Sequence, residues 1–76
     1  MSLINRTYRI KPNPARFGGG WNLQLIEAGR IIKTHKEPQN DYPKGFEFDG
    51  QKYNDLSLLA CKLNAQLWVE EGGMPV

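Results

Sequence analysis

Basic and aromatic residues alternate near the start of the chain, a combination that can bind nucleic acid. The four basic residues are Arg6, Arg9, Lys11 and Arg16, and Tyr8 and Phe17 lie among them. Basic side chains neutralise phosphates, and aromatic rings stack on unpaired bases. We therefore expect the four basic residues to steer an anionic partner toward this part of the chain. If Arg9 and Lys11 project to solvent from a strand, however, Tyr8 points into the core and is lost to stacking.

Charge is distributed unevenly along the 76 residues, although the net charge is only +2. Residues 1–36 hold seven Lys and Arg residues against one Glu, a net charge of +6. Residues 37–76 hold three Lys residues against seven Asp and Glu, a net charge of −4. This asymmetry is typical of a chain whose first half approaches an anionic partner, or of two halves whose charges pair across the domain.

Residues suited to catalysis or metal binding are few. His35 is the only histidine and Cys61 the only cysteine, too few for a zinc site or a disulfide within the chain. A catalytic His35 needs an orienting carboxylate, and the sequence does not place one beside it. Gly18–Gly20 precedes a predicted strand, whereas a phosphate-binding loop opens a helix. We expect no enzymatic activity, no metal ion and no cofactor.

The strongest pattern lies at the C-terminal end, where we predict a helix over residues 55–71 with Asn54 as its N-cap. At 100° per residue, this helix has apolar stripes on two opposite sides. One stripe consists of Leu56, Leu59, Ala60, Leu63 and Leu67, and the other of Leu58, Cys61, Ala65, Trp68 and Val69. One small sheet covers one stripe, so the other must meet a partner, a second copy of the chain or a folded-back loop.

The second stripe is the better candidate for an interface. Tryptophan is enriched at binding hot spots, and small residues one turn apart let another element approach closely. We therefore expect a partner-binding surface, or the seam of a homodimer, at Leu58, Cys61, Ala65 and Trp68.

Upstream of the helix, alternation of apolar and polar residues predicts an antiparallel sheet. The expected strands are residues 6–11, 21–25 and 30–35, with Tyr8, Ile10, Trp21, Leu23 and Leu25 pointing inward. Asp49-Gly50 predicts a further short hairpin, and residues 37–45 an exposed loop. The expected fold class is α+β: an antiparallel sheet of three to four strands with one C-terminal amphipathic helix packed on it, in a single domain of residues 1–76.

The chain lacks the features of a membrane or secreted protein. No apolar run reaches the roughly eighteen residues that cross a bilayer, and the N-terminus has no secretory signal pattern. A single cysteine is typical of a reducing compartment. We expect no contact with a membrane and a location in the cytoplasm, that of the host cell if the protein is encoded by a phage.

Two resemblances extend these expectations. Residues 48–60 read Phe-Asp-Gly-Gln-Lys-Tyr-Asn-Asp-Leu-Ser-Leu-Leu-Ala. They resemble the hairpin-to-helix element Asp-Gly-x-x-Tyr-x-x-Leu-Ser-x-x-Ala of small modules associated with restriction and modification systems. The whole chain is similar in size and architecture to small phage and prophage proteins, including anti-CRISPR proteins. The second resemblance implies an inhibitor that blocks a surface of a host protein or ribonucleoprotein complex.

We therefore expect a non-enzymatic binding protein, a phage-type accessory or counter-defence inhibitor that occludes a host nucleic-acid-handling complex. The alternative is a small nucleic-acid-binding module that acts through the basic N-terminal half. The two differ in salt dependence, because each phosphate contact releases counterions on binding.

Overall fold

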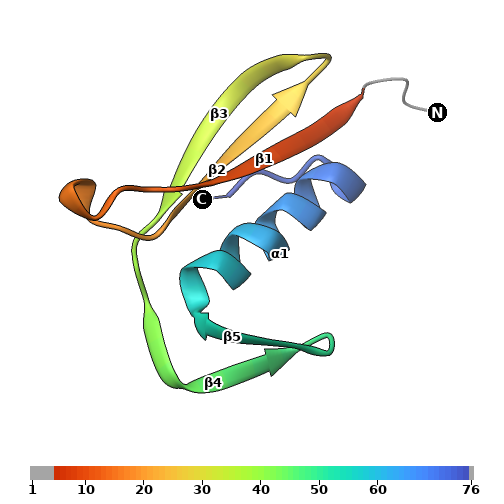
Figure 1. Cartoon of the computed structure of the whole chain (residues 1–76). Coiled ribbons are helices and arrows are strands. Elements are labelled where there is room, and N and C mark those ends of the chain that lie inside the picture. The colour runs from red at the N-terminus through yellow and green to blue at the C-terminus, as the bar shows by residue number, and fades with distance from the viewer. Residues whose placement is uncertain (1–4, 76) are drawn as a thin grey trace.

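Five strands, one short 3-10 helix and one α-helix form residues 5–75, the part of the chain that the computed structural model describes (Figure 1). In chain order the elements are β1 (Arg6–Pro12), η1 (Ala15–Phe17), β2 (Trp21–Glu27), β3 (Arg30–Glu37), β4 (Asp41–Phe48), β5 (Gln51–Asp55) and α1 (Leu56–Glu71). The predicted α+β class and C-terminal helix are confirmed.

The strands form two separate antiparallel sheets, with α1 between them. Sheet A consists of β1, β2 and β3, with β2 in the centre, and β4 and β5 form a two-stranded hairpin. Figure 1 shows sheet A above α1 and the hairpin below it. The helix therefore has packing partners on two sides.

The hairpin turns at Asp49-Gly50, as predicted. Their φ angles of 52° and 76° are both positive, as a two-residue type I′ turn requires. The expected loop over residues 37–45 was wrong in part, because residues 41–45 belong to β4. Pairing shifts register between Asp41 and Phe46, and this bulge accommodates a proline and a glycine that regular strand pairing disfavours.

Alternation along β2 builds the core of the molecule. Leu23 and Leu25 are fully buried and pack with Cys61, Ala65 and Trp68 of α1. Two further predicted inward residues, Ile10 and Trp21, pack partly buried against this cluster. Tyr8 pairs with the buried Leu25 and so shares its face of sheet A, but 48% of it stays exposed.

The helix begins one residue later than predicted, and its N-cap is Asp55 rather than Asn54. The Asp55 carboxylate accepts hydrogen bonds from the Ser57 amide (3.0 Å) and hydroxyl (2.6 Å). Burial alone would raise the pKa of Asp55, but these bonds, with one from the Asn40 amide, outweigh burial and lower the pKa below its ordinary value. At the other end, the left-handed Gly72 donates its amide to the Trp68 carbonyl, a common way to end a helix.

The apolar stripe that we expected to bind a partner is the one that packs on sheet A. Cys61, Ala65 and Trp68 are 0%, 1% and 2% exposed, so they are core residues and present no surface to a partner. The Trp68 indole Nε1 also donates a 2.8 Å hydrogen bond to the Thr7 carbonyl of β1. Leu58, the fourth expected residue, is half-buried.

The opposite stripe meets the hairpin only along its first half. Leu59 is 8% exposed, and it lines a small hollow with Phe48 of β4 and Tyr53 of β5. Leu63 and Leu67 are 43% and 40% exposed. The structure thus resolves the two-stripe pattern: sheet A covers one stripe, and a folded-back hairpin covers part of the other.

A membrane-spanning helix is absent from residues 5–75. The 16 residues of α1 are neither numerous nor apolar enough to cross a bilayer.

Candidate nucleic-acid interface

The side of sheet A that faces away from α1 is here called the outer face. It is defined by the residues that alternate with the buried Leu23 and Leu25 and by their partners across the sheet. Three cross-strand rows make it up: Thr7–Ile26–Ile31, Arg9–Gln24–Thr34 and Lys11–Asn22–Lys36. Each row takes one residue from each strand, so the six polar side chains of the last two rows form one continuous surface.

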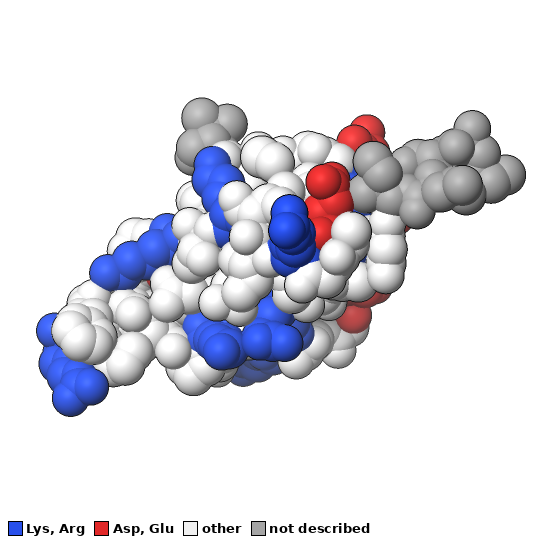
Figure 2. All heavy atoms as spheres, turned by 90° about the horizontal axis from the view of Figure 1, so that it is seen from above, with Lys and Arg blue, Asp and Glu red and all other residues white. Residues whose placement is uncertain are grey.

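The outer face is basic and free of acidic side chains within the described strands. Its charged residues are Arg9, Lys11 and Lys36, all exposed. The two acidic residues of sheet A, Glu27 and Glu37, pair with Arg6 and Trp21 and lie on the side that faces α1. In Figure 2, which views the molecule from the sheet side, Lys and Arg are spread widely and most of the Asp and Glu lies toward the right-hand half.

Within the described part of the chain, the Lys and Arg side chains of the basic half make no ion pair within 4 Å with a carboxylate of the acidic half. Among residues 5–75, the only ion pair within 4 Å joins His35 and Glu37. Lys33 and Lys36 donate instead to the carbonyls of Pro75 (3.1 Å) and Phe17 (2.6 Å). Of the two interpretations of the charge asymmetry, internal pairing therefore has no support in the described contacts, and the positive charge of the outer face remains open to an external anion.

Arg6 does not join the other predicted basic residues. It lies on the side of β1 that faces α1, where its guanidinium is 5.8 Å from the Trp68 ring centroid. Its Nη2 donates to the Val69 carbonyl at 3.3 Å, near the C-terminal end of α1, where a positive charge is favourable. Arg6 therefore contributes to the packing of β1 against α1. Because side chains alternate along a strand, it lies on the opposite face of β1 from Arg9 and Lys11.

Arg16 lies in η1, beside the Lys11–Lys36 end of the outer face. Its guanidinium is 5.0 Å from the ring centroid of Phe17, which is 58% exposed. The Phe17 carbonyl accepts from Lys36 and from the Asn13 side chain (3.0 Å). The bond from Lys36 links η1 to β3 of sheet A, so Arg16 lies beyond the Lys11–Lys36 end of the strands.

Sequence reasoning missed Lys36 and the three uncharged polar residues of the outer face, Asn22, Gln24 and Thr34. Strand alternation was the available signal for Asn22 and Gln24, because they stand between the residues predicted to point inward. Lys36 has no such signal, since its place opposite Asn22 depends on a register that shifts at Leu25/Ile26. That shift lets β3 accommodate one extra residue, Ile32.

The histidine and the cysteine lie on the other side of sheet A. His35 Nε2 is 2.7 Å from Glu37 Oε1, so the structure supplies the neighbouring carboxylate that the sequence does not place dependably. Cys61 is fully buried. Its burial raises the pKa of the thiol to about 11, with smaller contributions from the negative charges of Glu37 and Asp55. A covered thiol that stays protonated at neutral pH is a poor nucleophile. No cluster of three or more metal-ligating side chains occurs among the residues described.

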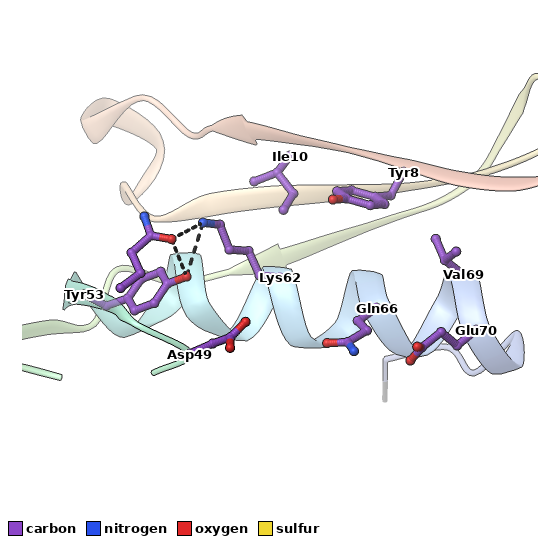
Figure 3. Close-up of a pocket in the computed structure, with 9 residues that line it drawn as sticks. Tyr8, Ile10, Asp49, Tyr53, Lys62, Gln66, Val69 and Glu70 are labelled. Atoms are coloured by element: carbon purple, nitrogen blue, oxygen red, sulfur yellow. Dashed lines mark hydrogen bonds between the residues drawn. The ribbon is translucent and has the colours of Figure 1, made fainter. Parts of the chain in front are cut away.

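An open groove runs along α1 between β1 and the hairpin (Figure 3). Tyr8 and Ile10 line its β1 side, and Lys62 and Gln66 line its floor on α1. Lys62 Nζ lies 3.2 Å from the Tyr53 hydroxyl and donates to it, and it also lies 5.1 Å from that ring's centroid. These contacts join the hairpin to the helix, so Lys62 and Tyr53 serve the packing of the fold.

No protein-family model, curated protein or solved structure matches this chain. The interpretation of the outer face therefore depends on its own chemistry.

Proposed function

We propose that this protein binds nucleic acid through the outer face of sheet A. One observation carries the proposal: three exposed basic residues share one polar surface of the described strands with no carboxylate on it. Phosphate contacts supply most of the affinity of such binding. Uncharged Asn, Gln and Thr side chains lie between these basic residues, and they add hydrogen bonds to phosphates or to the edges of nucleobases.

A pair of charge-matched variants tests this function. Arg9→Gln with Lys11→Gln removes two positive charges from the outer face, and Lys44→Gln with Lys52→Gln removes two from the hairpin. Fluorescence anisotropy with labelled nucleic acid should show weaker binding for the first variant alone. The slope of log K against log salt should become shallower by about 2, because each lost phosphate contact contributes about 0.9. If both variants lost the same affinity for nucleic acid, binding would depend on net charge alone, and the proposal would be contradicted.

A protein-binding role is the second candidate, and apolar side chains on the opposite side of the molecule favour it. Leu63, Leu67, Phe46 and Phe48 are each about 40% exposed. Phe48 and Leu63 line the same hollow between the hairpin and α1. Exposed apolar side chains grouped in this way are typical of protein interfaces. This role matches the host-complex inhibitor that the resemblance to counter-defence proteins implies.

The second candidate function predicts that a host protein stays bound at high salt concentration. A tagged protein should hold one host protein through nuclease and high salt, and Leu63→Ser with Leu67→Ser should release it. Ile31→Ser, at a 53% exposed site on sheet A, is the matched control and should retain the partner. Release by the Ile31 variant as well would place the contact elsewhere.

A further inference from the structure

We infer that the ligand of the outer face is duplex DNA, with sheet A entering the major groove. This inference rests on the proposed function and narrows it to one class of nucleic acid. Four properties of the outer face carry it: the absence of stacking rings, the types of its central side chains, the unpartnered acceptor of Gln24 and the width of the sheet.

The described strands offer no aromatic ring on the outer face. Tyr8 and Trp21 belong to the side that faces α1, because they alternate with Arg9 and Asn22. Phe17 is exposed, but it lies in η1 beyond the strands and stands next to the Arg16 guanidinium. Proteins that bind single strands use aromatic platforms on which successive bases stack. A surface of charges and amides without rings fits a partner whose bases are already stacked.

The side chains at the centre of the outer face are those that read base edges. Arg and Lys pair with guanine O6 and N7, and Asn and Gln pair with adenine N6 and N7. Rows Arg9–Gln24–Thr34 and Lys11–Asn22–Lys36 supply both kinds side by side. The third row is largely apolar, with Ile31 53% exposed, and apolar side chains contact the methyl group of thymine.

Gln24, in the middle of this surface, has unused hydrogen-bonding capacity. Its Oε1 is covered and finds no hydrogen-bond partner among the described residues. A buried acceptor without a partner is costly, so most such groups in folded proteins are satisfied. A nucleobase edge that draws the Gln24 side chain outward would give hydrogen-bond partners to both its Oε1 acceptor and its Nε2 donor.

The width of sheet A selects between duplexes. Strands about 4.8 Å apart place the outer backbones of a three-stranded sheet about 10 Å apart. The major groove of B-DNA is about 12 Å wide and admits a two-stranded β-ribbon, so two neighbouring strands of sheet A fit within it. The major groove of duplex RNA is deep and too narrow for side chains to read. The open sheet therefore fits DNA better than duplex RNA.

A competition experiment tests this inference separately from the proposed function. Duplex DNA, duplex RNA and single-stranded DNA of one mixed sequence compete for the full-length protein against a labelled DNA duplex. We expect duplex DNA to compete about tenfold better than the other two, and the protein to protect guanine N7 from methylation. Preference for a single strand or for RNA, or protection confined to the minor groove, would overturn the DNA inference and leave the proposed function standing. Binding to none of the three would overturn both.

A neutral substitution separates base reading from charge. Gln24→Ala removes an amide and no charge, so binding to a sequence selected from random duplexes should weaken by about tenfold. Binding to unrelated duplex DNA and the salt slope should not change. Gln66→Ala, which makes the same truncation at an exposed position of α1, is the control for surface truncation. If Gln24→Ala left the preferred sequence unchanged, the central row would not read bases and the inference would fail.

Discussion

Sheet A directs Leu23 and Leu25 toward α1 and Asn22 and Gln24 away from it, so adjacent residues of β2 belong to two different environments. The inner residues are fully buried against the helix. The outer residues lie between basic side chains that no carboxylate of the described chain neutralises. Because the side-chain period of a strand is two, both surfaces come from the same three segments. In this small domain, stability and binding are therefore encoded by alternate residues and can be altered separately.

The largest difference between the two sides is expected at Leu25 and Gln24. Leu25→Ala removes a fully buried side chain from the core and should lower the free energy of unfolding by about 2–5 kcal/mol. Gln24→Ala, one residue away, removes a half-buried amide whose Oε1 has no hydrogen-bond partner among the described residues, so it should change the free energy of unfolding by no more than about 0.5 kcal/mol. Urea denaturation followed by circular dichroism measures both values. A large loss for Gln24→Ala would mean that the outer face is part of the core of an assembly.

Features of this molecule that depend on local spacing could be predicted from the sequence, and features that depend on long-range contacts could not. The Asp-Gly turn, the helix and the alternation along β2 could be predicted, because each depends on local spacing. The choice between the two helical stripes could not, because both are apolar over several turns. It depends on long-range contacts such as Trp68 with Thr7, and on a hairpin that covers Leu59 while leaving Leu63 exposed.

The basic residues show the same limit. Arg6, Arg9 and Lys11 look equivalent in a list of charges, and strand alternation alone places Arg6 opposite the other two. That Arg6 then meets Trp68 and a helix end is a tertiary fact. Lys36 joins Lys11 across Asn22 only through the register of two strand pairs.

Asp55, the N-cap of α1, gives the next prediction. Its folded-state pKa is lowered, so the unfolded chain binds its proton more readily. The stabilisation is therefore complete above the unfolded pKa of about 3.9 and is lost as the pH falls through the folded value. Asp55→Ala should lower stability at neutral pH by about 1 kcal/mol, as the loss of an N-cap does, and should flatten the acid limb of stability against pH. An unchanged acid limb would show that other carboxylates control it.

Nucleic-acid affinity should be the same for Asp55→Ala as for the parent protein at neutral pH. The N-cap lies at the junction of β5 and α1 and on the side of sheet A that faces α1, where the Trp21 side chain also bonds its carboxylate, so it is not part of the outer face. A loss of affinity in a variant that remains folded would indicate that the hairpin side also contacts the ligand.

The sharpest comparison uses two arginines of one strand. Arg6→Gln removes the contact with the Trp68 ring and the bond to the Val69 carbonyl, and should cost about 1 kcal/mol of stability. Arg9→Gln should leave stability within about 0.5 kcal/mol and weaken nucleic-acid binding. Thermal unfolding and anisotropy on both variants give a two-by-two result in which each substitution affects one property. The two substitutions are identical in chemistry and in net charge. If Arg6→Gln lowers only stability and Arg9→Gln weakens only binding, the difference therefore comes from the face of β1 on which each residue lies. If Arg6→Gln weakened binding as much as Arg9→Gln while stability held, the positive field of the whole strand, rather than the outer face, would bind the anion.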